Sequence, residues 1–407
     1  MDKGLISPSA EVSIREKLPR PGKKRGFGSL FVHSRELVSF ELSPDHPFRP
    51  DRVYKTLELC RRYGIWDKPW MKVTAPVEVL DEELMRFHDP SYLRVLKEAS
   101  QGKISLETLE RGLGTKDCPI VPGLYEWALS LVGGTLAAMR AILEGEVDVA
   151  VNLYGGLHHA MPGHAEGFCY LNDIAVSILE AVERGCKVAY LDCDAHHGNG
   201  VQEAFYRDPR VLVISIHETG RTLYPWGGWE TQLGEGEGYG YNVNIPLEPG
   251  SDDEVYQLAF DSLVPPLLKA FDPDLLVAQI GADSLISDPL THLRLTNNGY
   301  SHAVRWIAGQ GRPILALGGG GYDIYRTARC WTLAWAILND LEPKDELAGL
   351  VGGMMFGPEM EVGSLLDAPH PSKGEVKEKA MGEAGRVIGF IQEKVFPIHG
   401  IATGIAQ

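Results

Sequence analysis

Acidic residues and histidines crowd the stretch 187–202, KVAYLDCDAHHGNGVQ. Asp192, Asp194, His196 and His197 lie within six residues, directly after an apolar run and before a glycine-rich turn. Asp194 and His196 occupy alternate positions of an extended segment, so both side chains point the same way. Carboxylate and imidazole groups are ligands for divalent metals. We therefore predict that Asp194 and His196 hold a metal ion, and that other parts of the chain bring further groups to it.

A catalytic metal site needs a third protein ligand and an open position for water and substrate. Asp283 follows the apolar run 275–280 and is the natural candidate. An Asp–His–Asp set suits Zn²⁺, and Fe²⁺ or Co²⁺ also fits these donors. The alternative is a polar loop of hydrogen-bonded aspartates. The cluster together with Asp283 favours the metal site.

A tandem pair, His158-His159, follows two glycines after another apolar run. Two adjacent histidines at a strand end fit general acid–base work better than plain packing in the core, which is the alternative. A histidine base needs an acceptor that orients its other ring nitrogen. Asp192 lies outside the proposed ligand set and is free to orient His158, and Asn199 can do the same for His159.

Four glycines precede Tyr322 in the stretch 318–322, GGGGY. A phosphate-binding loop would need a following Lys-Ser/Thr, and a dinucleotide site would need a downstream acidic residue. Both are missing from the sequence at the required places. The pattern favours a flexible loop that presents the Tyr322 phenol to a developing oxyanion. Gly320 of this loop is counted among the substrate-binding candidates.

Continuous apolar strands alternate with helical patterns, which predicts an α/β fold with a parallel sheet buried on both faces. Nearly every candidate reactive residue falls just after a strand, where open parallel sheets bind their ligands. The stretch 218–242 is predicted to be a long loop. The predicted strands are 29–32, 148–153, 188–191, 211–216, 275–280 and 313–317. The predicted helices are 51–63, 81–87, 90–99, 126–143, 174–183, 201–206, 253–270, 300–310, 328–338 and 387–395.

Composition narrows the class of function. The chain has 407 residues, 44% of them hydrophobic, and a net charge of −16. That charge argues against non-specific binding to nucleic acid or to anionic membranes, although it would attract a basic substrate. The six cysteines are scattered and are expected to be reduced thiols. The first residues lack the apolar core of a signal peptide, and the sequence shows no membrane span, so we expect a cytoplasmic protein.

Six ordered motifs resemble the histone-deacetylase superfamily, closest to the bacterial acetoin-utilization-type deacetylases. The resemblance runs from Asp45 to the helix after Tyr322 and implies a single-domain arginase/deacetylase-like fold. That fold has a central, mostly parallel sheet of about eight strands with helices on both faces. The motifs are GGLHHA (155–160), GFCYLND (167–173), DCDAHHGNG (192–200), SIHETGRTLYPWGG (215–228), GADSLISDP (281–289) and GGGGY (318–322).

The resemblance assigns a role to each candidate residue. It implies zinc ligands Asp194, His196 and Asp283, with Tyr322 polarising the substrate carbonyl and His158 and His159 beside the attacking water. It implies a substrate channel with walls from Phe168 and Tyr224, a mouth at Leu290 and a rim aspartate at Asp117. Arg52, which pattern alone places toward water, matches an interior arginine near the route for released acetate. A structural K⁺ is also implied, at Asp192, Asp194, His196, Ser215 and Ile216.

Two positions depart from the family pattern. Tyr224 replaces the usual Phe, which predicts a more polar channel. Asn199 stands where some members have an aspartate behind the second histidine. An amide favours the imidazolium form of His159 less than a carboxylate does.

The implied activity is removal of acetyl or other short acyl groups from lysine side chains in proteins. An acetylpolyamine deacetylase and a catalytically dead acetyl-lysine binder are alternatives. A binuclear arginase-type enzyme would need a carboxylate two residues after His196, where this chain has Gly198. The predicted organisation is a flexible segment 1–26, a catalytic domain 27–395 and a tail 396–407.

Overall fold

The structure is a computed structural model that describes residues 28–343 and 365–402. The predicted flexible segment 1–26 lies outside the described residues. The predicted boundary between domain and tail at residue 395 stays a prediction.

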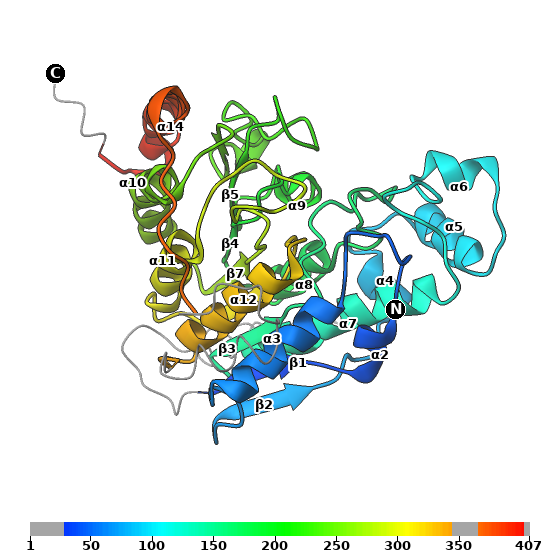
Figure 1. The fold of residues 1–407 in the computed structure, drawn as a ribbon. Helices are drawn as coiled ribbons and strands as arrows, with labels where there is room; N and C mark the ends of the chain where they lie inside the picture. Colours follow the sequence, from blue (N-terminus) through cyan, green and yellow to red (C-terminus); the bar gives the residue numbers. More distant parts are fainter. Residues whose placement is uncertain (1–27, 344–364, 403–407) are drawn as a thin grey trace, which may run out of the picture.

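One eight-stranded sheet forms the centre of the molecule (Figure 1). Its strand order is β2-β1-β3-β8-β7-β4-β5-β6, and all seven strand pairings are parallel. The prediction of an α/β fold with a parallel sheet is therefore confirmed. The strands are β1 (Ser29–Val32), β2 (Met71–Thr74), β3 (Val149–Asn152), β4 (Val188–Asp192), β5 (Val211–Glu218), β6 (Asn242–Leu247), β7 (Leu275–Gln279) and β8 (Ile314–Leu317).

Six of these strands match the predicted ones to within about two residues, but β2 and β6 have no predicted counterpart. β2 is an edge strand whose residues are all partly or fully exposed, so it lacks the apolar run of a central strand. β6 is fully buried, yet its sequence NVNIPL carries two asparagines and a proline. Proline is confined to edge strands, where its missing N–H costs no ladder bond, and β6 is the other edge.

Helices cover the sheet in layers (Figure 1). Neighbouring helices in one layer are α3 (Asp51–Arg62), α12 (Ile324–Leu338), α11 (Asn297–Ala308), α10 (Asp253–Phe271) and α14 (Gly374–Lys394). A second group packs α7 (Leu124–Leu143) against α8 (Asp173–Glu183) and against β1, β3 and β8. α14 begins far earlier than the predicted helix 387–395. The shorter helices are α2 (Arg35–Ser39), α4 (Asp81–Leu84), α5 (Pro90–Ser100), α6 (Leu106–Glu110) and α9 (Asn199–Phe205), with 3₁₀ turns at Gly236–Gly238 and Phe396–His399.

Helix α7 is long and apolar enough to cross a membrane by length and composition alone. Two thirds of its apolar 18-residue stretch is buried inside the protein, however. Its apolar composition is therefore explained by packing against α8 and the sheet.

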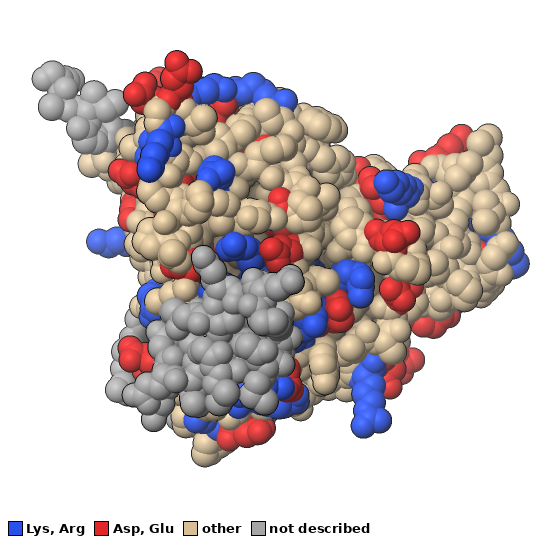
Figure 2. Space-filling model, in the orientation of Figure 1, with Lys and Arg blue, Asp and Glu red and all other residues tan. Residues whose placement is uncertain are grey.

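The surface view shows acidic and basic side chains interspersed over this face of the described residues (Figure 2). Together with the net charge of −16, this pattern is unlike the continuous basic surface of a nucleic-acid binder.

Candidate active site

Sheet order brings the candidate residues together. The strands β3, β8, β7 and β4 are consecutive in the sheet although they are far apart in the sequence. The loops that follow their carboxyl ends carry the histidine pair, the Tyr322 loop, Asp283 and the Asp194-x-His196 segment, in that order. Ligands of open parallel sheets bind at this edge. The topology thus gathers every predicted catalytic residue at one place.

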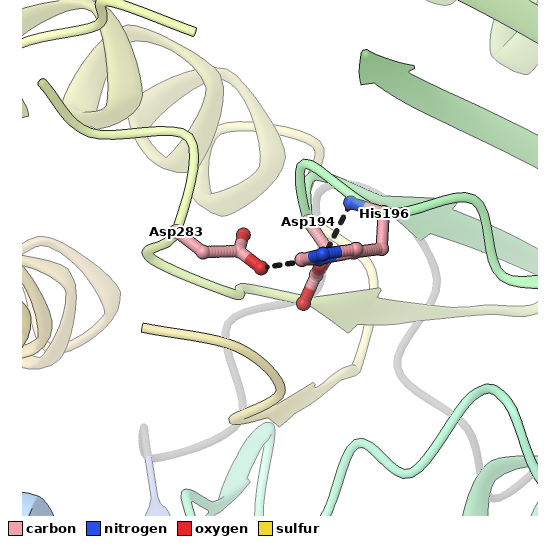
Figure 3. Close-up of side chains that lie close together, drawn as sticks. All are labelled: Asp194, His196 and Asp283. Atoms are coloured by element: carbon pink, nitrogen blue, oxygen red, sulfur yellow. Dashed lines mark hydrogen bonds and ion pairs between the residues drawn. The ribbon is translucent and has the colours of Figure 1, made fainter. Parts of the chain in front are cut away.

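Asp194, His196 and Asp283 form a compact, buried trio of donor groups (Figure 3). His196 Nδ1 lies 3.1 Å from Asp194 Oδ1 and 2.8 Å from Asp283 Oδ2. The three ligand atoms all lie within 4.8 Å of one another. Among the described residues, this is the group of histidine, cysteine and acidic side chains with the spacing of a metal site.

The other oxygen of each carboxylate accepts hydrogen bonds from neighbouring groups. Asp194 Oδ2 accepts hydrogen bonds from Gln279 Nε2 and from the Gly320 N–H, each at 2.7 Å. Asp283 Oδ1 accepts from the Ala195 N–H at 2.8 Å. Such supporting bonds orient ligand atoms toward a metal. A Cβ on Gly320 would lie 2.1 Å from Asp283 Oδ2, so this position requires glycine.

The electrostatics of the trio fit a divalent cation. Burial, and next the Asp194 carboxylate, raise the pKa of Asp283 far above its usual range. Burial alone would lower the pKa of His196, but hydrogen bonds to Asp194 and Asp283 raise it to about 10. Two buried carboxylates this close therefore require a neighbouring positive charge. A divalent ion between the same donor atoms supplies that charge, so the residues present fit zinc.

The two histidines of the pair differ in their partners. His158 Nδ1 lies 2.8 Å from Asp192 Oδ2, and His159 Nδ1 lies 2.8 Å from Asn199 Oδ1, as predicted from the sequence. The two Nε2 atoms lie 3.1 Å apart. Asp192 also accepts a hydrogen bond from the Tyr190 hydroxyl at 2.7 Å, a partner that the sequence did not indicate.

Opposite pKa shifts accompany these partners. Burial alone would lower the pKa of His158, but the Asp192 and Asp194 carboxylates raise it above the ordinary value. Burial, and next the charges of His158 and His196, lower the pKa of His159 well below it. Neighbouring titratable groups with divergent pKa values are typical of acid–base sites.

Asp173 holds the loop that carries the histidine pair. This buried first residue of α8 accepts hydrogen bonds from the N–H groups of Gly156, at 3.0 Å, and Leu157, at 2.8 Å. It also accepts from the Thr135 hydroxyl at 2.6 Å. Asp173 closes the GFCYLND motif, but the motif alone did not indicate this role.

The Tyr322 loop is anchored on both sides. Asp288 Oδ2 accepts from the Tyr322 N–H at 2.8 Å, and Arg52 donates to the carbonyls of Gly319, at 2.5 Å, and Gly321, at 2.9 Å. Arg52 is only 1% exposed, as the resemblance implied and against the expectation from pattern alone. Burial, and next the Asp283 and Asp194 carboxylates, raise the pKa of Tyr322, so the phenol keeps its proton as a donor.

A cavity of about 20 Å³ lies among these groups, with room for about one water molecule. The Phe168 ring lies edge-on to Tyr322 at 5.7 Å, and the Tyr224 ring lies edge-on to His159 at 5.1 Å. The predicted channel walls therefore lie beside the catalytic groups. The cavity is lined by Phe48, Gly156, Leu157, His158, His159, Gly167, Phe168, Cys169, Gly319, Gly320 and Tyr322.

The Tyr224 hydroxyl is the group that led us to expect a more polar channel. The oxygen is buried, and burial, then the Glu166 carboxylate, raise the pKa of the phenol. The hydroxyl has no hydrogen-bond partner among the described residues, and the more polar channel stays a prediction.

The residues predicted at the rim and the mouth of the channel are Asp117 and Leu290. Asp117 is exposed, and its carbonyl lies 3.2 Å from His46 Nε2. Leu290 is half-buried, and its N–H bonds to Asp288 Oδ1 at 3.0 Å. Both positions are compatible with the predicted rim and mouth, which stay predictions.

Gly198 leaves no space for a second metal ligand. A Cβ at this residue would lie 2.4 Å from Asp192 Oδ2 and 3.3 Å from His158 Nδ1. A carboxylate here would displace the partner of His158, which agrees with the sequence argument against a binuclear site.

The residues predicted to bind potassium come from β4, from the segment that follows it and from β5. Strand register places Asp192 opposite Ser215, and Ile216 follows in the same buried strand. The Ser215 hydroxyl lies 2.7 Å from His217 Nδ1. Binding of K⁺ by Asp192, Asp194, His196, Ser215 and Ile216 remains a prediction.

Comparison with known proteins identifies the family. A family model described as the histone deacetylase domain matches residues 46–338. The acetoin utilization protein AcuC of Bacillus subtilis is 39% identical over 327 residues, which are 78% of this chain and 84% of that protein. Histone deacetylase 1 of Homo sapiens is 35% identical over 334 residues, 82% of this chain and 69% of that protein. Histone deacetylase 9 of Arabidopsis thaliana is 36% identical over 320 residues, 78% of this chain and 74% of that protein. The chain therefore belongs to the histone deacetylase family.

Proposed function

We propose that this protein is a zinc-dependent deacetylase that hydrolyses acetyl or other short acyl amides of lysine side chains in proteins or peptides. One observation carries the proposal: a buried Asp194–His196–Asp283 trio lies at the same sheet edge as a histidine pair and a protonated tyrosine. Metal-dependent amide hydrolysis uses these parts, namely a Lewis acid, a proton acceptor and donor, and an oxyanion donor.

Asp194, His196 and Asp283 would hold the zinc ion, which would supply Lewis acidity for the acyl carbonyl and the attacking water. The chain's own residues supply the rest of the chemistry. With each Nδ1 turned to Asp192 or Asn199, the facing Nε2 atoms of the pair can exchange protons with the reactants.

Hydrolysis removes one proton from water and delivers one to the departing amine. His158, stabilised as a cation by Asp192, can hold a proton at Nε2, while His159 stays neutral and accepts one. The Tyr322 phenol donates a hydrogen bond to the oxygen on which negative charge develops. The backbone bond from Tyr322 to Asp288 keeps the phenol at the site.

A comparison of substrates tests the proposal. Purified protein is given acetyl-lysine peptides, peptides with longer acyl groups and acetylpolyamines, each with and without a chelator. We expect chelator-sensitive release of acetate, with a kcat/KM for acetyl-lysine peptides at least tenfold above that for acetylpolyamines. The reverse order would assign the site to acetylpolyamines. Peptide binding without turnover would make the protein an acetyl-lysine binder.

A further inference from the structure

Glu166 lies behind the histidine pair and has no part in the mechanism above. Its side chain is 26% exposed, and it immediately precedes the turn at Gly167. One carboxylate oxygen accepts a hydrogen bond from Asn199 Nδ2, and the other lies 3.1 Å from His164 Nε2. Asn199 in turn presents Oδ1 to His159 Nδ1 at 2.8 Å. The contacts therefore form a chain from Glu166 through Asn199 to His159.

A carboxylate at the end of this chain decides how the amide is oriented. The two ends of an asparagine side chain are nearly equal in shape, and only their hydrogen-bond partners distinguish them. An ionised Glu166 only accepts hydrogen bonds, so the Asn199 amine must face it. The Asn199 oxygen must then face His159.

The amide orientation fixes the tautomer of His159. Because Asn199 Oδ1 can only accept, His159 Nδ1 carries the proton and donates it. His159 Nε2 is then the unprotonated nitrogen, and it faces His158 Nε2 at 3.1 Å. An asparagine without Glu166 could rotate its amine toward His159 and select the opposite tautomer, which puts the proton on the nitrogen that must accept one.

The charge of Glu166 also strengthens the acceptor. Hydrogen bonds to ionised groups are about twice as strong as neutral ones, and chained hydrogen bonds polarise one another. A carboxylate beyond the amide therefore makes Asn199 Oδ1 a better acceptor than an isolated amide would be.

The surroundings of Glu166 support a specific role. Tyr224 packs edge-on to His159 at 5.1 Å, and its buried hydroxyl lies beside Glu166. Of the two departures from the family pattern, Asn199 is the one that hydrogen-bonds to this carboxylate, and the Tyr224 hydroxyl has no such bond.

We propose that Glu166 is a positioning residue for His159, which acts through Asn199 to fix the tautomer and ring orientation that proton transfer requires. In this chain it takes the place of the carboxylate that some family members have directly behind the second histidine. The proposal deepens the proposed function and rests on it for its kinetic test.

Three variants separate the effects of Glu166. Glu166→Ala removes both the charge and the acceptor, and Glu166→Gln keeps an acceptor without the charge. Glu166→Ala combined with Asn199→Asp places a carboxylate directly behind His159. Glu98→Gln, which alters an exposed carboxylate paired with Arg94, is the matched control.

We expect Glu166→Ala to lower kcat about tenfold with KM unchanged, as is usual when a supporting partner is lost. Glu166→Gln should retain more of the rate, and the combined variant should recover most of it. Zinc content and thermal midpoint, measured for every variant, show whether the site is still folded. A Glu166→Ala enzyme with wild-type kcat, or a combined variant no faster than Glu166→Ala at full zinc content, overturns the proposal.

A spectroscopic readout tests the tautomer without catalysis. In protein labelled with ¹⁵N-histidine, the His159 ring signals are identified by their loss in His159→Gln. We expect a protonated Nδ1 in the wild type and a mixture of tautomers in Glu166→Ala. If the wild type hydrolyses no acyl-lysine, the proposed function fails, and this spectrum alone decides on Glu166. The same tautomer in both proteins contradicts the positioning role.

Discussion

At the scale of single residues, a substitution of Tyr322 can separate catalysis from metal binding. Its phenol contacts the site without belonging to the donor trio, and burial keeps it protonated. We expect Tyr322→Phe to lower kcat by about 10²–10³, the usual loss for an oxyanion donor. Zinc content should be unchanged. Tyr239→Phe, at an exposed tyrosine, is the control, and a Tyr322→Phe enzyme as fast as this control would remove the phenol from the mechanism.

His88 makes a residue-scale prediction about stability. This buried histidine accepts a hydrogen bond from the Asn172 N–H at 2.9 Å, and burial lowers its pKa to about 4. The unfolded chain binds a proton near pH 6.5, so the contribution of His88 to stability is complete above that pH and is lost as the pH falls toward 4. The expected loss is about 2 kcal/mol at pH 5.

Thermal unfolding at pH 7.5 and pH 5 measures this effect. The drop in midpoint should be smaller in His88→Gln than in the wild type, because the variant has no imidazole to titrate. Equal drops in the two proteins would show that other groups account for the acid sensitivity.

The sequence predicted the groups that carry chemistry more fully than the groups that support them. Asp194, His196 and the histidine pair stand out because reactive residues follow apolar runs at short spacing. Gln279 and Asp288 support the site from positions with no such signal, since a single polar residue in a strand or loop looks like any other. Their partners are backbone atoms and carboxylates from distant segments, which only the folded chain brings near.

At the scale of elements, the buried strands were predictable and the edge strands were not. β3, β4, β5, β7 and β8 each begin with a short, continuous apolar run because helices cover both faces of the sheet. The edge strands β2 and β6 lack that pattern, the first because it is exposed and the second because asparagines and a proline interrupt it.

Helix α8 provides the prediction at this scale. Its first residue, Asp173, ties down the loop of the histidine pair through two backbone N–H groups and the Thr135 hydroxyl. Asp173→Asn keeps the volume but replaces one acceptor oxygen by a donor that faces other donors. We expect a loss of about 2 kcal/mol in the free energy of unfolding, since hydrogen bonds to charged groups contribute about that much.

Glu183→Gln is the matched control, because it alters an exposed carboxylate at the other end of α8. Thermal or urea unfolding compares the two variants, and deacetylation of an acetyl-lysine peptide reports on the loop. An Asp173→Asn protein as stable as Glu183→Gln would contradict the anchoring role.

At the scale of the whole molecule, the order of strands in the sheet brings the residues of the site together. The alternation of strands and helices predicts a parallel sheet, and its carboxyl edge as the place for ligands. The alternation of strands and helices does not predict the order β3-β8-β7-β4. That order places four loops from distant parts of the sequence side by side. The order depends on which helices cover which face, and the resemblance implied about eight strands without their order.

For the whole site we propose that one divalent metal, bound by Asp194, His196 and Asp283, supports deacetylation. Gly198 argues for one ion, because even a Cβ there would collide with Asp192 and a second carboxylate ligand has no space at this position. The most direct test is a titration of chelator-stripped protein with Zn²⁺, in which the rate of hydrolysis of an acetyl-lysine peptide is followed. We predict negligible activity without metal and a linear rise that saturates at one equivalent of zinc per chain. Full activity in the stripped protein, or saturation only at two equivalents, would contradict it.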